Sequence, residues 1–83
     1  MKILYFAWLR TQLGTAEETI ELPSDVTTLD DLILFLKEKG DTYRSAFADM
    51  TVIRIAVDQE YVTGNVPLGG VTEIAFFPPV TGG

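Results

Sequence analysis

The end of the chain holds the residues whose types and order could do chemistry. The sequence closes with Phe76-Phe77-Pro78-Pro79-Val80-Thr81-Gly82-Gly83. Glycine at the last two positions lets a narrow channel of another protein close around the backbone, because no Cβ is in the way. The carboxylate of Gly83 is then the reactive group at the tip, and it becomes an electrophile once ATP converts it to an acyl-adenylate. The alternative is a frayed glycine end without a role, since chain ends are commonly poorly ordered.

The rest of the composition excludes most other kinds of active site. The chain has no cysteine and no histidine, which excludes a thiolate nucleophile, the usual general base and the commonest metal ligands. We therefore expect no bound cofactor and no metal. The six basic residues are scattered and the net charge is −6, so the clustered basic face of a nucleic-acid binder is missing. The acidic surface suits a protein partner with a basic patch, or it only keeps an apolar domain in solution.

Length and composition predict one small domain. Eighty-three residues with 47% apolar content allow one core, and we expect a domain over residues 1–77 followed by an extended tail over residues 78–83. No apolar run reaches membrane-spanning length, and the apolar start lacks the basic segment and cleavage site of a secretory signal. These features predict a cytoplasmic protein without membrane contact.

Alternating apolar residues predict the strands that must hold the tail. Strands are expected over residues 1–9, 18–22, 52–57 and 71–77, with a short extended segment at Tyr61-Val62. The second strand is expected to pair antiparallel with the first. The last strand must end at Phe77, because two prolines in series remove two amide donors and leave the chain stiff and extended.

One main helix is predicted over residues 29–39, between the second and third strands. Its apolar positions recur at helical spacing, at Leu29, Leu32, Ile33 and Leu36. Thr27 and Thr28 are candidate N-caps, with an aspartate three residues after each, and Gly40 is expected to end the helix. A further short helical turn is predicted over residues 42–48. This order predicts an α+β protein of the β-grasp, or ubiquitin-like, class: a mixed sheet of about four to five strands on one main helix, with the last strand parallel to the first.

Strand alternation also predicts an exposed aromatic surface. The residues expected to face the helix are Ile3, Tyr5, Ile55, Val57, Ile74 and Phe76. In that case Phe6, Arg54 and Phe77 lie on the open face, and Tyr61 is expected to join them. Aromatic anchors beside an arginine are typical of the centre of a protein interface. The alternative for each aromatic residue is a place in the core. Trp8 could belong either to the core or to the exposed surface.

The tail and the opening of the chain resemble the small subunit of molybdopterin synthase, a family of ubiquitin-like sulfur carriers. The resemblance covers essentially the whole chain. It is carried by the run from Ala75 to Gly83, by Lys2-Ile3-Leu4-Tyr5-Phe6-Ala7 with Leu9-Arg10, and by Leu13-Gly14. Relatives that carry sulfur for thiamin usually lack the Phe-Phe-Pro-Pro run, so the tail favours the molybdenum-cofactor branch.

The resemblance implies how the tail works. An adenylating enzyme related to ubiquitin activators would use ATP to charge Gly83, and a persulfide sulfur would convert it to a thiocarboxylate. The charged tail would donate its sulfur to cyclic pyranopterin monophosphate, building the dithiolene of molybdopterin for molybdenum cofactor biosynthesis. The subunit would thus be the sulfur-donating part of a sulfurtransferase, with the catalytic pocket on the large subunit, in a heterotetramer of two small and two large subunits.

The resemblance also implies which residues take part. The reactive end would be Gly82 and Gly83. The residues toward the partners would be Phe6, Arg10, Tyr61, Phe77, Pro78, Pro79, Val80 and Thr81.

Two positions depart from the family pattern. Many members have an Asp-Gly-Asp-Glu turn before the last strand, where this chain has Gly69-Gly70-Val71-Thr72-Glu73, and many carry Asn at the position of Asp58. Both lie outside the tail, so they concern turn geometry or partner preference. Three other functions stay open: a sulfur carrier for thiamin or tRNA thiolation, a ubiquitin-like interaction module with an inert tail, and a modifier that is attached to lysines.

Overall fold

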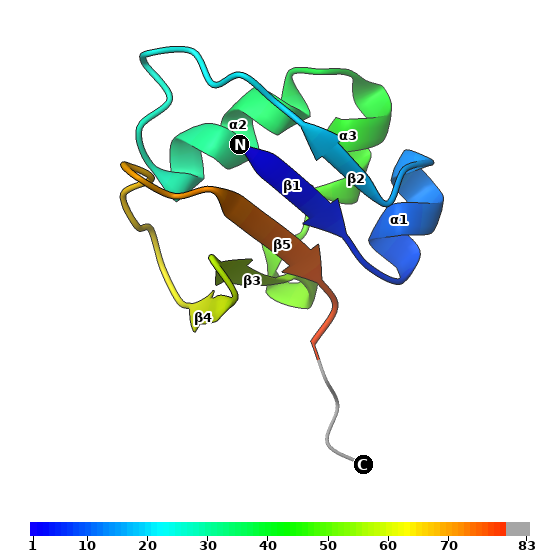
Figure 1. The fold of residues 1–83 in the computed structure, drawn as a ribbon. Coiled ribbons are helices and arrows are strands. Elements are labelled where there is room, and N and C mark those ends of the chain that lie inside the picture. The colour runs from blue at the N-terminus through cyan, green and yellow to red at the C-terminus, as the bar shows by residue number, and fades with distance from the viewer. Residues whose placement is uncertain (80–83) are drawn as a thin grey trace.

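The computed structural model describes residues 1–79, which form a mixed five-stranded sheet with helices on one face (Figure 1). The strands are β1 (Lys2–Tyr5), β2 (Glu17–Thr19), β3 (Arg54–Val57), β4 (Glu60–Val62) and β5 (Glu73–Phe77). The helices are α1 (Trp8–Leu13), α2 (Leu29–Lys37) and α3 (Asp41–Ala46). The strand order is β2-β1-β5-β3-β4, with β1 and β5 parallel at the centre and antiparallel pairs elsewhere. The predicted pairing of the first, second and last strands is confirmed.

The core lies between the sheet and the helices and is rich in aromatic residues. Ile3, Tyr5, Ile74 and Phe76 alternate along the central strands and are all buried. The Phe76 ring stacks on Tyr5 with centroids 6.1 Å apart, and its edge meets Phe47 of the segment after α3 at 4.9 Å. Aromatic pairs in such arrangements add stabilisation beyond the area they bury, so the central parallel pair is firmly held.

The predicted first strand over residues 1–9 is wrong in its second half. The strand ends at Tyr5, and Trp8 begins helix α1. Ala7 takes a positive φ of 54°, which redirects the chain out of the sheet, and the helix buries Leu9 completely. Burying Leu9 within the helical layer stabilises the fold more than a longer β1 would. A longer β1 would run past the end of β5 and find no partner strand there. Gly14 ends α1 in the left-handed conformation, as a glycine after a helix commonly does.

Helix α2 begins where the sequence predicts and ends earlier. Thr28 caps it: its Oγ1 accepts a hydrogen bond from the Asp31 N–H at 3.3 Å, and the Asp31 carboxylate accepts one from the Thr28 N–H at 3.2 Å. This reciprocal capping box satisfies N–H groups that the helix leaves free. The helix ends at Lys37 rather than residue 39, and Gly40 precedes α3 instead of ending α2. The Lys39 N–H bonds to the Leu36 carbonyl, a tighter turn that closes the helix early.

Other predicted boundaries also shift. The third strand begins at Arg54 because residues 50–52 form a 3₁₀ turn, capped by Asp49, instead of extending the strand. The second strand covers residues 17–19, although Ile20 still bonds to Met1. The last strand begins at Glu73 instead of residue 71. The predicted turn over residues 42–48 is α3, which begins one residue earlier and ends at Ala46. No helix within residues 1–79 is long and apolar enough to cross a membrane.

The two departures from the family pattern lie against each other in space. Asp58 has a positive φ of 48°, in the turn between β3 and β4. Its Oδ1 accepts hydrogen bonds from the Thr72 N–H at 3.1 Å, the Thr72 hydroxyl at 2.9 Å and the Glu73 N–H at 3.0 Å. These bonds lower the pKa of Asp58, led by the Thr72 N–H. Asp58 therefore ties the β3–β4 turn to the start of β5.

Candidate functional site

The open face of the sheet carries the aromatic residues that the sequence predicted there. Arg54 lies opposite Phe77 in the ladder between β3 and β5, and Tyr61 lies opposite Ala56 between β4 and β3. All therefore project to the face away from the helices. The rings of Tyr61 and Phe77 lie 5.4 Å apart, and Tyr61 is 77% exposed. An aromatic residue this exposed is available to a partner.

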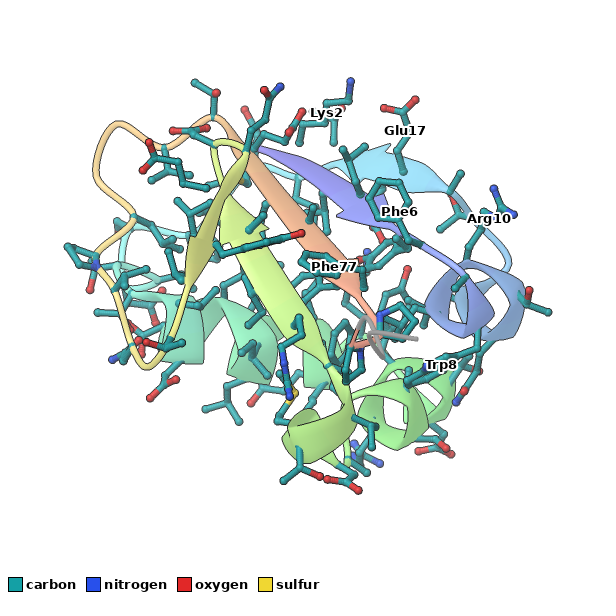
Figure 2. The ribbon with its side chains drawn as sticks, turned by 90° about the horizontal axis from the view of Figure 1, so that it is seen from below. Lys2, Phe6, Trp8, Arg10, Glu17 and Phe77 are labelled. Atoms are coloured by element: carbon teal, nitrogen blue, oxygen red, sulfur yellow. The ribbon has the colours of Figure 1, made fainter. Side chains whose placement is uncertain are left out.

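Phe6 completes this surface at the end of β1. Its N–H donates a hydrogen bond to the Phe76 carbonyl at 3.1 Å, so it keeps the spacing of the sheet one residue past the strand. Its side chain is 46% exposed, and Figure 2 shows Phe6 and Phe77 over the neighbouring strands β1 and β5. We call the three aromatic residues Phe6, Tyr61 and Phe77 the open-face patch.

Arg10 and Trp8 lie on α1, beside the sheet rather than on it (Figure 2). Arg10 is exposed. By sequence, Trp8 fitted either the core or the exposed surface. It is 37% exposed and lies outside the buried core. Arg10 therefore lies on a different element from the residues of the open-face patch.

The tail starts at the end of the central strand β5. The strand ends at Phe77, as the two prolines predicted, and Pro78 and Pro79 follow with half-buried side chains. Because Phe77 lies opposite Arg54 and against the Tyr61 ring, the tail starts next to Arg54 and the open-face patch. The other predicted site residues, Val80, Thr81, Gly82 and Gly83, lie outside the residues that the structure describes.

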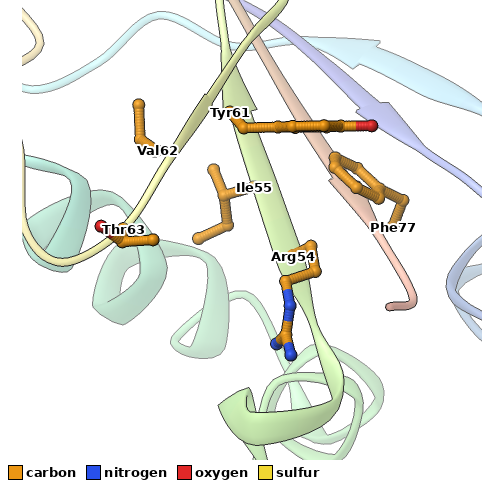
Figure 3. Close-up of a pocket in the computed structure, with 6 residues that line it drawn as sticks. All are labelled: Arg54, Ile55, Tyr61, Val62, Thr63 and Phe77. Carbon is orange, nitrogen blue, oxygen red and sulfur yellow. The ribbon is translucent and has the colours of Figure 1, made fainter. Parts of the chain in front are cut away.

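A hollow of about 260 Å³ opens between the β3–β4 edge and the last residue of β5. Figure 3 shows Ile55 in its middle, with Tyr61 and Phe77 to one side and the Arg54 guanidinium pointing away from both rings. The hollow is lined by Arg54, Ile55, Tyr61, Val62, Thr63 and Phe77. The sequence did not reveal it, because alternation assigned Ile55 to the helix side and gave no sign that an edge strand would leave its flank open. A second hollow of about 550 Å³ shares Arg54, Ile55, Val62 and Thr63 and continues toward α2.

Glu18 is the acceptor for three side-chain donors away from the open face. Its carboxylate accepts hydrogen bonds from the Tyr5 and Tyr43 hydroxyls, both at 2.8 Å, and forms an ion pair with Lys39. Burial acts to raise the pKa of Glu18, but the hydrogen bonds from Lys39, Tyr43 and Tyr5 outweigh burial and lower it. Burial and the bond to Glu18 raise the pKa of Tyr5. Tyr5, Lys39 and Tyr43 are 13 to 25 positions from Glu18, so sequence spacing gave no signal for this cluster.

No cluster of possible metal ligands is found in the described part of the chain. Among residues 1–79, no three carboxylates come close enough to hold an ion, and no buried side-chain polar atom lacks a hydrogen-bond partner.

Comparison with known proteins identifies the family. A family model described as the ThiS family matches residues 3–83. The chain belongs to the ThiS family. Over 83 residues it is 36% identical to the molybdopterin synthase sulfur carrier subunit of Escherichia coli (strain K12), covering 100% of this chain and 99% of that protein. The protein of the same name from Mycosarcoma maydis is 36% identical over 87 residues, covering 100% of this chain and 92% of that one.

A solved structure supports the same assignment. The protein described as molybdopterin converting factor, subunit 1, from Pyrococcus furiosus superposes with a TM-score of 0.67 at 30% identity, covering 95% of each chain. The predicted resemblance and the predicted β-grasp fold of this ThiS-family chain are both confirmed.

Proposed function

We propose that this ThiS-family chain is the sulfur carrier subunit of a molybdopterin synthase. The observation that carries the proposal is the likeness to relatives with that name over their whole length, including the residues that align with the tail. The geometry of the described residues agrees with it. The central strand leads into two prolines beside an exposed aromatic patch.

On this proposal the reactive group is the carboxylate of Gly83. An adenylating partner binds ATP, the carboxylate attacks its α-phosphate, and pyrophosphate leaves. The terminal sulfur of a protein persulfide then attacks the acyl carbon, and AMP leaves. A thiol breaks the remaining sulfur–sulfur bond, which frees the thiocarboxylate and forms a disulfide.

The thiocarboxylate is the form that donates sulfur. Its sulfur attacks a carbon of cyclic pyranopterin monophosphate in the large subunit, and the carbon–oxygen bond at that carbon breaks, so that the oxygen leaves as water or stays on the phosphate. Hydrolysis of the acyl–sulfur bond then leaves sulfur on the pterin and restores the carboxylate. Each sulfur of the dithiolene therefore needs its own charged carrier. A heterotetramer of two small and two large subunits is part of this proposal.

The chain's own contribution is positioning. Without histidine or cysteine, it leaves proton transfer to its partners. Strand β5 is anchored on both sides by β1 and β3, so the tail begins from a rigid base. The proposed docking surface for both partners is the open-face patch with Arg10 at its side, because exposed aromatic side chains are the usual anchors of interfaces.

The mass of the intact protein purified from cells tests the carrier chemistry. We expect part of the population to carry sulfur in place of one terminal oxygen. A variant without Gly83 should show no such exchange and should unfold at the same denaturant concentration, since β5 ends at Phe77 and terminal residues commonly contribute little to stability. Sulfur transfer by that variant would refute the carrier function, and a population that never gains sulfur would favour an inert interaction module.

A reconstituted assay tests the pathway. The thiocarboxylate form, mixed with cyclic pyranopterin monophosphate and the large subunit from the same organism, should yield molybdopterin. Failure here, with successful thiolation of a thiamin precursor or of tRNA, would assign the chain to another carrier pathway. Conjugates of high mass on a denaturing gel would instead indicate a protein modifier.

A further inference from the structure

Arg54 is a cation without a carboxylate among its described neighbours. The chain holds 12 acidic and 6 basic residues, and Lys2, Lys39 and Arg44 each form an ion pair. Arg54 Nη1 instead donates to the backbone carbonyls of Thr51 at 3.1 Å and Ile53 at 3.3 Å. No carboxylate within residues 1–79 lies within ion-pair distance of it. In a chain with an excess of acids, this leaves an exposed arginine able to pair with an outside carboxylate.

The position of Arg54 makes this relevant to docking. It lies opposite Phe77, the last residue before the tail, in the ladder between β3 and β5. Any protein that surrounds the base of the tail must therefore cover Arg54. Arginine is enriched at interfaces, because its guanidinium binds carboxylates in a planar, directional way.

The hollow beside Arg54 has the lining for an apolar side chain. Its volume is about 260 Å³, and it adjoins the second hollow toward α2. Tyr61, Phe77, Ile55 and Val62 give it apolar walls, and Arg54 stands at its rim (Figure 3). This arrangement suits an aliphatic or aromatic side chain with an acidic group next to it.

We propose that Arg54 is a specificity-determining contact for the large subunit of the synthase. An apolar side chain of that subunit enters the hollow, and a carboxylate beside it pairs with Arg54. The inference rests on the proposed function, because it takes the large subunit as the partner. The chain as a whole carries a charge of −6, so it repels an acidic group of a partner unless that group meets a cation. Arg54 therefore sets the orientation of docking.

The test compares substitutions that remove the same charge at two places. Arg54→Met keeps the apolar stem and removes the charge, whereas Arg44→Met removes an exposed arginine on α3, away from the open face. Both substitutions are at exposed positions, so both variants should unfold at the wild-type temperature. An unchanged unfolding temperature would show that folding is unaffected. Affinity for the large subunit of the same organism is measured by calorimetry with the full chain at low and at high salt.

We expect Arg54→Met to raise Kd about tenfold at low salt and to flatten the dependence of Kd on salt, because the ion pair is gone. Arg54→Lys should restore part of the affinity, and Arg44→Met should stay within about twofold of wild type. An unchanged Kd for Arg54→Met, with wild-type binding intact, would overturn this inference and leave the proposed function standing. A wild-type chain that does not bind the large subunit would overturn the proposed function and the inference with it.

A second copy of this chain is the competing occupant of the hollow. Sedimentation of the isolated wild-type protein and of Arg54→Met separates the two cases. A monomer in both supports the proposal. Self-association of the wild type that the substitution abolishes would assign the hollow to another copy and overturn it.

Discussion

Phe76 and Phe77 are consecutive residues of one strand with opposite environments. Phe76 is completely buried, with Tyr5 and Phe47 around it, while Phe77 is half-buried on the open face beside Tyr61. Tyr5 and Phe6 at the end of β1 repeat the contrast, with exposed fractions of 1% and 46%. The same residue types therefore serve the fold on one face and remain available on the other.

The contrast shows how a chain of this size builds both a core and a docking surface. The period of two along a strand sends neighbouring side chains to opposite faces, so β1 and β5 supply both surfaces at once. The helices cover one face and none of the described elements covers the other (Figure 1). We therefore expect substitutions on the two faces to separate stability from binding.

Phe76→Ala should have the largest effect. Removing a buried aromatic side chain from a core costs about 3–5 kcal/mol, a large share of the stability of a small domain. Urea unfolding followed by fluorescence measures it. The matched variant is Phe77→Ala, for which we expect a loss of unfolding free energy of less than about 1.5 kcal/mol. Equal losses at both positions would contradict the division between the two faces.

Tyr61→Ala should weaken binding and leave stability almost unchanged, the reverse of Phe76→Ala. We expect stability within about 0.5 kcal/mol of wild type and a loss of binding to the large subunit of about 2 kcal/mol, roughly 30-fold in Kd. Calorimetry gives the affinity. Leu34→Ala is the control, because Leu34 is 59% exposed on α2, on the helix side. Binding that falls as much with this control as with Tyr61→Ala would show that the open face is not the docking surface.

Glu18→Gln should weaken the fold in a pH-dependent way, because Glu18 connects Tyr5 of the core face with Tyr43 and Lys39. The loss of charge-assisted hydrogen bonds costs about 1–2 kcal/mol at neutral pH. The folded pKa of Glu18 lies below its ordinary value, so its contribution is complete above the ordinary pKa. It is lost as pH falls through the lowered folded value.

Urea unfolding across acidic pH measures the effect at Glu18. The stability of wild type and variant should converge as the pH falls. A constant difference down to the lowest pH would contradict the role of the ionised carboxylate. Binding of the large subunit at neutral pH should stay unchanged, since Glu18 contacts the helix side.

Asp58→Ala should give the smallest effect, a fall of a few degrees in the melting temperature. The substitution removes the acceptor shared by Thr72 and Glu73 and places alanine at a positive φ. Calorimetric melting measures it. Asp58→Asn keeps a side-chain oxygen and tolerates this backbone conformation, so it should melt close to wild type. An equal fall in both variants would show that the carboxylate charge, rather than the hydrogen bonds, matters.

Much of the fold and part of the site could be predicted from local patterns. Alternation in β1 and β5 placed Tyr5 and Phe76 inside and Phe6 and Phe77 outside. The capping box at Thr28 marked the start of α2, and the two prolines marked the end of β5. These features depend on a few adjacent residues, so local chemistry is enough to predict them.

Other features depended on contacts that no local pattern reports. Helix α1 has six residues, too short for a clear periodic signal, and it forms because burying Leu9 in the helical layer outweighs a strand that would have no partner. The cluster at Glu18 brings together residues that are 13 to 25 positions apart. The contact between Asp58 and Thr72 likewise depends on how the strands are ordered.

The sequence by itself determined which side chains alternate along each strand, where α2 begins and where β5 must stop, because backbone geometry and capping act over a few bonds. Only the tertiary structure decided that the β4 edge leaves a hollow and that Arg54 stands beside it without a carboxylate among its described neighbours. Those outcomes follow from how distant elements pack together, and packing is a property of the whole domain.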